Sequence, residues 1–181
     1  MTQTDQDLEQ TTIKTVSKDM VVTFHYRLYS VDDEGNTGKQ LETSYDATPV
    51  TYLHGHNNIV PGLERAMADK ANGAEFSITL QPDEAYGQRN DKAVQRVPAK
   101  HIHEYKKGKT FRPGQVVTVQ TNQGRRQVVV LKAGKFNVDV DFNHPLAGAA
   151  LYYEIKIEDL RAATAEELAH GHAHGPGGHH H

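Results

Sequence analysis

The chain has 181 residues, 36% of them hydrophobic, and a formal net charge of −3. This length allows one ordinary domain or two small ones, and no apolar run approaches the roughly eighteen residues that span a bilayer. We therefore expect no membrane partner, and the acidic balance argues against nucleic acid, which needs a clustered cationic face. Without cysteine there are no disulfides, and without a basic, apolar leader we expect a cytoplasmic protein.

The first part of the sequence alternates between loops and short strands. Residues 1–17 are rich in Thr, Gln and Asp, which predicts a flexible extension. Over residues 20–28 every second side chain is apolar or aromatic, as in a strand with one buried face. A turn-rich loop over 32–38 is followed by extended segments at 41–44 and 50–53.

A short helix is predicted next. Residues 57–58 are two asparagines that can cap its N-terminus, and Pro61 suits the first turn, where an N–H group has no partner within the helix. Asn72 and Gly73 are expected to end the helix, because glycine accepts the left-handed conformation of a helix terminus. The apolar residues at four-residue spacing along the helix are Ile59, Leu63 and Met67.

Alternating residues also predict strands at 76–80 and 151–158. Several antiparallel strands and one short helix define an α+β fold in which a sheet wraps the helix. Residues 94–138 are too many for a structureless loop inside a compact domain, so we expect them to fold by themselves. Valine-rich runs separated by glycine-containing turns predict strands there, at 116–119, 128–131 and 136–140.

Three motifs suggest a pocket without nucleophile, acid pair or phosphate loop. Residues 52–64 read Tyr-Leu-His-Gly-His-Asn-Asn-Ile-Val-Pro-Gly-Leu-Glu, residues 82–87 read Pro-Asp-Glu-Ala-Tyr-Gly, and residues 143–148 read Asn-His-Pro-Leu-Ala-Gly. They gather apolar and aromatic groups as the lining of a pocket would. This pattern resembles the FKBP-type peptidyl-prolyl cis-trans isomerases, and its wording is similar to that of their bacterial SlyD branch.

The resemblance implies a domain organisation. An FKBP-like antiparallel sheet wrapped around a short helix would be formed by residues 18–93 and 139–163. Residues 94–138 would be a small β-rich insert-in-flap domain, a chaperone module that binds unfolded chains and delivers prolines to the pocket. The alternative is a lid whose valines only pack against one another. Residues 164–181 would be a histidine-rich tail.

Prolyl isomerisation needs a pocket and no cofactor. Rotation about an X-Pro bond crosses a barrier of roughly 18–20 kcal/mol because the C–N bond has partial double-bond character. The twisted amide of the transition state is less dipolar than the planar amide, so an apolar pocket that excludes water favours it. The resemblance assigns to this catalytic pocket Tyr26, Leu41, Glu42, Ile59, Val60, Leu63, Tyr86 and Tyr153.

Roles follow from the same assignment. Tyr86 would offer its hydroxyl to the imide, and a backbone N–H at the start of the helix would hold a substrate carbonyl. Glu42 stands where many members have aspartate. Leu63 replaces a tryptophan of many eukaryotic members and Leu41 stands where an aromatic is common, so we expect a shallow pocket. Any one of these residues alone would more often be ordinary core or surface, and their joint spacing carries the assignment.

The last twelve residues contain six of the twelve histidines. Imidazole suits nickel, copper and zinc, and a glycine-containing segment, mobile until something binds, can bring several rings to one ion. SlyD-like proteins commonly take part in nickel handling, so the resemblance implies Ni²⁺ first, Zn²⁺ next, and nickel-enzyme maturation proteins as partners. The competing explanation is a purification tag. The candidate ligands are His170, His172, His174, His179, His180 and His181.

These inferences combine into a monomeric prolyl isomerase whose clients are unfolded or proline-containing polypeptides. The alternative is a peptide-binding holdase and nickel metallochaperone whose isomerase pocket is vestigial. Substitution of Tyr86 and Glu42 distinguishes the two, because only an enzyme should lose rate while keeping its affinity for peptide.

Overall fold

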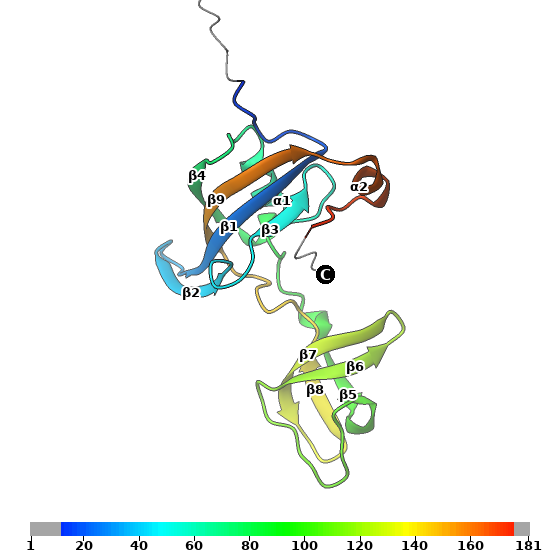
Figure 1. Ribbon diagram of the computed structural model, residues 1–181. Coiled ribbons are helices and arrows are strands. Elements are labelled where there is room, and N and C mark those ends of the chain that lie inside the picture. The colour runs from blue at the N-terminus through cyan, green and yellow to red at the C-terminus, as the bar shows by residue number, and fades with distance from the viewer. Residues whose placement is uncertain (1–11, 176–181) are drawn as a thin grey trace, which may run out of the picture. The chain divides into compact units, whose positions relative to one another are not determined.

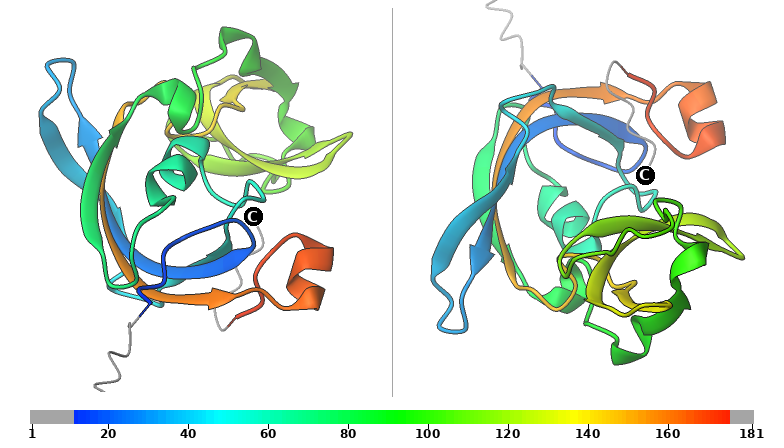
Figure 2. Two further views of the ribbon diagram at one scale, coloured as in Figure 1. Left: turned by 90° about the horizontal axis from the view of Figure 1, so that it is seen from above. Right: turned by 90° about the horizontal axis from the view of Figure 1, so that it is seen from below.

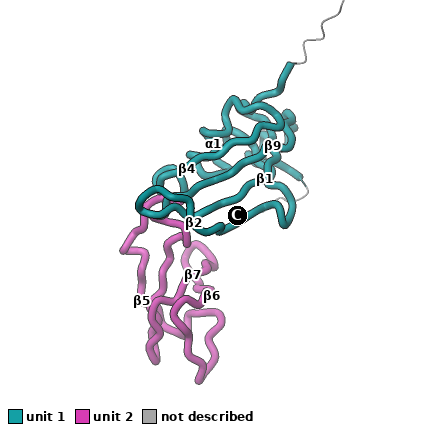
Figure 3. Tube along the Cα trace, turned by 90° about the vertical axis from the view of Figure 1, so that its left-hand side faces the viewer, with its two compact units in different colours: residues 1–85, 149–181 teal, residues 86–148 magenta. Residues whose placement is uncertain are grey.

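The computed structural model describes residues 12–175. Within that range the chain forms two compact units (Figure 3). The first contains the described residues up to 85 and from 149 onward, and the second contains residues 86–148. Among the described residues, no helix is long and apolar enough to cross a membrane.

The first unit is an antiparallel sheet of five strands in the order β2-β1-β9-β4, with β3 also pairing with β1 (Figure 1). The central pair is the longest, because β1 and β9 pair from Met20 opposite Ala162 to Ser30 opposite Leu151, with one shift of register between Thr23 and Phe24. The strands are β1 (Met20–Val31), β2 (Thr37–Thr43), β3 (Val50–Leu53), β4 (Glu75–Leu80) and β9 (Leu151–Ala162).

The sheet curves around one short helix, α1 (Pro61–Met67), as Figure 2 shows. Seven residues are too few for a helix that is stable alone, so packing of its buried Leu63 and Met67 against the sheet holds it in place. The sheet contributes alternating buried side chains such as Val22, Phe24 and Leu28 on β1. The predicted α+β fold, an FKBP-like sheet wrapped around a short helix, is thus confirmed.

The helix differs from the prediction at both ends. Val60 is the N-cap residue and no side chain caps the helix. The asparagine at 57 lies in the left-handed region, at a φ of 56°, and the Asn58 amide oxygen instead accepts a hydrogen bond from the Leu53 N–H at 3.1 Å. The helix ends at Met67 and not near residue 72, because Asp69 turns left-handed at a φ of 64° and redirects the chain.

Residues 14–17 are ordered, so the prediction of a flexible extension through residue 17 is wrong for them. The Val16 N–H donates to the Lys70 carbonyl at 2.9 Å, and the Asp69 N–H donates to the Val16 carbonyl at 2.9 Å. Val16 is fully buried, and Thr15 forms a bridge with Ala71. This pairing takes the segment after α1 out of helical geometry. Residues 1–11 of the predicted extension lie outside the described residues.

The second unit has a four-stranded antiparallel sheet in the order β5-β8-β7-β6. Its separate core consists mainly of valines, with Phe111 as a buried aromatic residue. The strands are β5 (Val94–Pro98), β6 (Val116–Thr121), β7 (Gly124–Ala133) and β8 (Asn137–Asp141). Short 3-10 turns are η1 (Pro82–Glu84) in the first unit, and η2 (Asp91–Ala93) and η3 (Ala99–His101) in the second.

The second unit extends beyond residues 94–138 at both ends. Strand β8 continues to Asp141, which pairs with Val94. Beyond that pair, the segment before β5 and the segment after β8 are joined through Asn90 and Asn143, and we call this pairing the stem. The Asn90 N–H donates to the Asn143 side-chain oxygen at 2.9 Å, and the Asn143 amide donates to the Asn90 carbonyl at 3.0 Å.

The described tail begins with helix α2 (Ala165–His170). Thr164 caps its N-terminus by accepting a hydrogen bond from the Glu167 N–H, and the Glu167 carboxylate accepts from the Thr164 N–H in return. Gly171 ends the helix with a φ of 72°, a left-handed conformation that costs glycine little.

Candidate functional site

Aromatic side chains from three strands gather on the side of the first sheet that faces α1. The ring centroids of Phe24 on β1 and Tyr52 on β3 are 5.8 Å apart in an edge-to-face arrangement. Tyr26 lies 6.0 Å from Phe24 and 6.0 Å from Tyr153 of β9. Such separations favour aromatic pairs, so the sheet offers a preformed aromatic wall.

Glu42 and Tyr26 are joined across strands β1 and β2. The Tyr26 hydroxyl donates a hydrogen bond to the Glu42 carboxylate. Glu42 stands opposite Leu28 in the register of the two strands, and Tyr26, two residues before Leu28, lies on the same face of β1, so the two side chains are diagonal neighbours. Leu41 falls at an irregularity of this register and is 43% exposed. The structure therefore fixes the Tyr26 ring through Glu42 and leaves Leu41 largely in solvent.

The turn that leads into α1 presents unpaired backbone donors. Ile59 and Val60 are half-buried, and their N–H groups donate to no other described residue. One turn into the helix, Leu63 is only 4% exposed. The turn itself is held from both sides, since the Gly55 N–H donates to the Glu64 carboxylate at 2.7 Å and Asn58 binds Leu53.

Gly62 fixes how closely α1 approaches the 3-10 turn η1. A Cβ added there would lie 2.7 Å from the Glu84 Cβ and 2.7 Å from the Glu84 carbonyl oxygen. It would also lie 2.8 Å from a Leu80 methyl group. Only a residue without a side chain permits this approach, which explains the glycine after Pro61 in the motif.

Beside the same turn, Tyr52 and His54 form a buried polar pair. The Tyr52 hydroxyl oxygen and the His54 Nδ1 are 2.9 Å apart, and the residues are 2% and 8% exposed. Burial raises the pKa of Tyr52 and lowers the pKa of His54, in the second case against the opposing charges of Glu64 and Asp69. Both groups are therefore neutral at physiological pH and act as structure.

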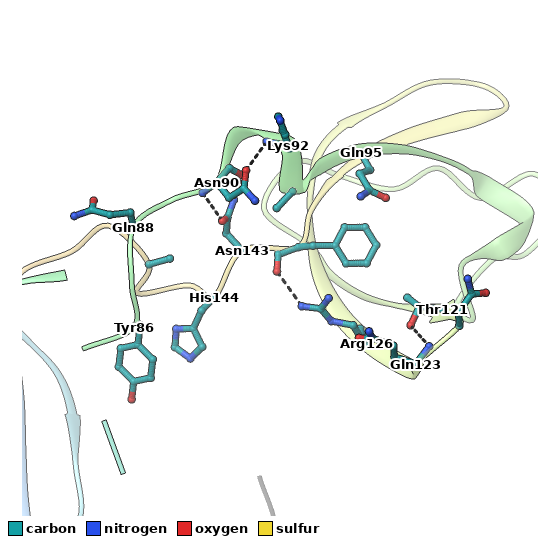
Figure 4. A pocket seen from close by; sticks show the side chains of 14 residues that line it. Tyr86, Gln88, Asn90, Lys92, Gln95, Thr121, Gln123, Arg126, Asn143 and His144 are labelled. Atoms are coloured by element: carbon teal, nitrogen blue, oxygen red, sulfur yellow. Dashed lines mark hydrogen bonds between the residues drawn. The ribbon is translucent and has the colours of Figure 1, made fainter. Parts of the chain in front are cut away.

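Tyr86 belongs to the second unit and is described with it. Its ring stacks on the His144 ring with the centroids 4.0 Å apart and the planes 4° from parallel. The His144 Nδ1 accepts a hydrogen bond from the Leu146 N–H at 3.1 Å, which orients the imidazole. Figure 4 shows the Tyr86 hydroxyl directed away from Asn90 and Asn143.

The same view shows a cavity of about 600 Å³ inside the second unit (Figure 4). Tyr86 and His144 line one end, and Lys92 and Arg126 add positive charge. Most of the remaining lining is amide side chains, which can both donate and accept hydrogen bonds. These amides are Gln88, Asn90, Gln95, Asn122, Gln123 and Asn143.

Three histidines of the tail lie together. The candidate ligand atoms of His170, His172 and His174 are all within 4.8 Å of one another, and all three residues are exposed. The His170 Nδ1 and the His174 Nε2 are 3.0 Å apart. Because Gly171 ends α2 and reverses the chain, the later two rings fold back beside His170. Three imidazoles on one exposed face are a donor set that fits Ni²⁺ or Zn²⁺.

A buried carboxylate holds this segment in place. Glu167 is 1% exposed and accepts two hydrogen bonds from Arg161, at 2.8 and 2.6 Å, and a third from the His174 N–H at 2.8 Å. The Arg161 contact holds the pKa of Glu167 well below its usual range. The Asn58 amide donates to the Gly171 carbonyl at 2.9 Å. Residues 170–174 are thus anchored rather than mobile as predicted, and the last three histidines lie outside the described residues.

Of the residues predicted for the pocket, Tyr26, Glu42 and Tyr153 are brought together by strand pairing, and Ile59, Val60 and Leu63 lie at the start of α1. Tyr86 lies in the other unit. Sequence reasoning missed His144 as the ring behind Tyr86 and missed Glu167 as the anchor of the tail. The Thr-Ala-Glu-Glu pattern at 164–167, typical of a capping box, could have revealed the second.

Comparison with known proteins agrees with this geometry. The model of the family described as FKBP-type peptidyl-prolyl cis-trans isomerase matches residues 13–158. The FKBP-type peptidyl-prolyl cis-trans isomerase SlyD of Aeromonas hydrophila is 43% identical over 150 residues, which are 83% of this chain and 68% of that protein. The SlyD proteins of Vibrio cholerae and Escherichia coli K12 are 37% and 36% identical, over 90% and 88% of this chain and 77% and 78% of theirs.

The chain therefore belongs to the family of FKBP-type peptidyl-prolyl cis-trans isomerases and is an enzyme of that class. Within the family it is similar to the SlyD proteins over most of its length. This confirms the family resemblance that the three motifs indicated. Isomerisation by this class requires no cofactor.

Proposed function

We propose that this isomerase acts on X-Pro bonds of unfolded or partly folded proteins, with catalysis centred on the first unit and client capture in the second. The observation that carries the catalytic part is the aromatic wall in which Glu42 fixes Tyr26 beside Tyr153. The wall is preformed, so it excludes water from an imide without a further rearrangement.

Each residue of the pocket has a physical role in this proposal. Tyr26 and Tyr153 supply apolar faces that disfavour the planar, dipolar amide relative to the twisted one. Glu42 is a positioning residue, because it touches the Tyr26 hydroxyl. The N–H groups of Ile59 and Val60, unpaired among the described residues, would hold a substrate carbonyl, with Leu63 as the apolar floor.

Tyr86 is proposed as the donor to the imide, and Leu41 as a contact at the rim. Stacking on His144 supports the role of Tyr86, since it restricts the ring and so lowers the entropy lost when the hydroxyl meets substrate. The 43% exposure of Leu41 supports a rim position rather than a wall.

The test is cis/trans exchange of a short Ala-Leu-Pro-Phe peptide, measured by NMR with chelator present and protein at catalytic concentration. Tyr86→Phe should lower kcat/KM about tenfold, the effect of one lost hydrogen bond to the reacting imide, and Glu42→Leu about fivefold, because it removes the acceptor that positions the Tyr26 hydroxyl, while peptide affinity stays unchanged. Tyr45→Phe, at a tyrosine that is 42% exposed, is the matched control and should have no effect.

An exchange rate at background, with peptide still bound, would support the alternative in which the pocket is vestigial and the protein is a holdase. The wild-type rate therefore decides between the two before any variant is made. An unchanged rate in Tyr86→Phe would remove that residue from the proposal and leave the aromatic wall intact.

Client capture by the second unit is supported by its separate core and by the apolar side chains that it leaves exposed. Phe136 is 72% exposed and Val116, the first residue of β6, is 57% exposed. The outer edge of β6 is partly covered by the segment after η3, but β5 forms the other edge of the sheet, and an edge strand can accept an extended peptide by adding it to the sheet. A lid that only closed the pocket would have no need of exposed apolar side chains on its outer strand.

The stem allows a clean deletion. Asn90 and Asn143 are already hydrogen-bonded to each other, so a short glycine turn can replace residues 91–142. The shortened protein should isomerise the tetrapeptide within about threefold of wild type, but its acceleration of proline-limited protein refolding should fall about a hundredfold as the effective client concentration is lost. Undiminished refolding activity would refute the chaperone role.

We also propose that His170, His172 and His174 bind Ni²⁺, with Zn²⁺ second, and that the partners of this site include nickel-enzyme maturation proteins. The support is the convergence of three imidazoles within 4.8 Å. Titration calorimetry should show one strong site that is lost when the three are changed to Gln. The same change at residues 179–181 separates their contribution, and retention of full affinity in the first triple variant would overturn the assignment.

A further inference from the structure

Charge is divided very unequally between the two units. Residues 86–148 contain twelve lysines and arginines against four acidic residues, a net charge of +8. The remainder of the chain contains eight lysines and arginines against nineteen acidic residues, a net charge of −11. The overall value of −3 therefore conceals a strongly basic unit.

Most of this positive charge is not neutralised within the unit. Asp139 pairs with Arg96 at 2.7 Å and Asp141 pairs with Arg89 at 2.6 Å. Glu104 is also engaged, because its carboxylate accepts a hydrogen bond from the Thr118 N–H at 2.9 Å. All residues of this unit are described, and ten of its twelve cations form no ion pair with a described residue.

Part of this charge surrounds a cavity of about 280 Å³ on the β6 side of the sheet. Its wall is η3 with the segment after it, which runs along the outer edge of β6 through the bridge between Ile102 and Val119. No acidic residue lines it. Its polar lining includes Lys100, His101, His103, Tyr105, Gln120 and Arg125.

The side chains of Lys100, His101 and Arg125 are exposed and form no hydrogen bond or ion pair with any described residue. The protein itself already places one carboxylate at this edge, since Glu104 binds the backbone of β6 at Thr118. This edge therefore already binds one carboxylate, and the side chains of Lys100, His101 and Arg125 can donate charge-assisted hydrogen bonds to further carboxylates.

The opposite face of the same hairpin is also basic. Successive residues of a strand point to opposite faces, and Arg126, next to Arg125 on β7, lines the larger cavity together with Lys92. That cavity has no acidic lining residue either. Positive charge is thus available on both faces of the β6–β7 hairpin.

The ligand class follows from charge and from the neighbouring apolar groups. A carboxylate-rich ligand complements the charge, and the exposed Val116, Leu131 and Phe136 of the same unit require a ligand with apolar groups as well. An acidic stretch of unfolded polypeptide has both. Nucleic acid is a weaker fit, because its charged phosphate backbone offers no aliphatic side chains to these exposed apolar residues.

We propose that the second unit selects acidic segments of unfolded polypeptides, with carboxylates held in the cavity formed by Lys100, His101 and Arg125. This rests on the client capture proposed above and adds which clients are captured. Long-range attraction by the net charge of +8 speeds encounter, and the cavity provides the local contacts.

The experiment uses the full chain and two fluorescent, proline-free peptides of equal length and equal apolar content, one rich in Glu and one rich in Lys. Fluorescence anisotropy at physiological salt should show the acidic peptide bound about tenfold more tightly. Raising the salt to about 0.5 M should remove most of that preference, because screening shortens the reach of the charges. Isomerisation of the proline tetrapeptide is measured in parallel.

Two double variants remove the same charge at different places. Lys100→Gln with Arg125→Gln should weaken the acidic peptide about tenfold, whereas Lys109→Gln with Arg112→Gln, outside both cavities, should weaken it about twofold through the general field alone. Tetrapeptide isomerisation should stay unchanged in both. Equal losses in the two variants would overturn the cavity as the site.

The other outcomes separate this inference from client capture. Equal binding of the two peptides would overturn the preference and leave capture standing, whereas no binding of either would overturn both. A single-stranded oligonucleotide of equal charge serves as a third probe. If it bound more tightly than the acidic peptide, the ligand would be nucleic acid and the proposal would be wrong.

Discussion

The two units of this isomerase differ in the size and aromatic content of their hydrophobic cores. Among the described residues the first unit buries fifteen hydrophobic side chains, including Phe24, Tyr52 and Tyr153, around one helix. The second buries nine, and a single aromatic, Phe111, is among them. Yet the second leaves Phe136 at 72% and Val116 at 57% exposure.

A large aromatic core holds pocket residues at fixed separations, whereas a small valine core leaves little stability to spare. The contrast teaches that one chain can join a rigid first unit, suited to catalysis, to a less stable second unit with exposed apolar side chains, suited to binding. Perturbing one unit should therefore leave the properties of the other intact, and four substitutions test this division.

The largest expected effect is on the stability of the first unit. Gly62→Ala should lower the free energy of unfolding of the first unit by about 3 kcal/mol, because the new methyl group would overlap the Glu84 backbone and Leu80. Isomerase activity should fall as α1 moves. Gly38→Ala is the control, since its Cβ would meet only the rotatable Ser30 hydroxyl within 3 Å, and urea unfolding of both variants gives the comparison.

The second effect concerns the small core. Val130→Ala, at a fully buried position of β7, should destabilise the second unit by about 2 kcal/mol through the cavity that it leaves. Refolding assistance should drop while tetrapeptide isomerisation persists. Residue-specific NMR signals during urea unfolding distinguish the units, and Val94→Ala, at a position of β5 that is 37% exposed, is the matched control. A parallel loss of signals from both units would contradict their independence.

A smaller effect is expected within the pocket. Tyr26→Phe keeps the ring but removes the hydrogen bond to Glu42, so kcat/KM for the tetrapeptide should fall about fivefold as the ring loses its fixed position. Tyr29→Phe removes the neighbouring hydrogen bond of the same kind on β1, to Glu154, and should leave the rate unchanged. Equal rates in the two variants would mean that Glu42 does not position Tyr26 for catalysis.

The smallest effect is a pH dependence of stability. Burial lowers the pKa of His54 in the folded protein, so the unfolded state binds more protons below about pH 6.5. His54 therefore contributes stability that is complete above that pH and is lost as the pH falls toward the folded-state pKa. His54→Gln should flatten the decline of unfolding free energy between about pH 7 and 5, and an unchanged slope would show that His54 is not responsible.

Much of the first unit was predictable because its strands are half-buried. A period of two located β4 within one residue of its start, and one-sided burial is what creates that period. The end of α1 was not predictable in this way. Pairing of Thr15 with Ala71 decides it, and a window of local sequence contains only one partner of that pair.

The candidate site shows the same limit. The family resemblance assigned Tyr26, Glu42 and Tyr153 to one pocket; the structure brings them together on neighbouring strands, and their catalytic role stays a prediction. His144 lies far along the chain from Tyr86, and its role depends on a stacking that no periodicity reveals. The net charge of −3 did not reveal the basic second unit, because it was averaged over the whole chain. Electrostatic attraction acts over about a Debye length, which is comparable to the size of one unit.

The paired asparagines of the stem, Asn90 and Asn143, have a consequence for evolution and engineering. They exchange hydrogen bonds across the two crossings of the chain, so the points at which the second unit leaves and re-enters are already neighbours. An insertion joined at such a point adds no long loop to close when the host folds. The stem is thus a point at which the second unit can be replaced by a binding domain of other specificity, which would direct the same isomerase toward new clients.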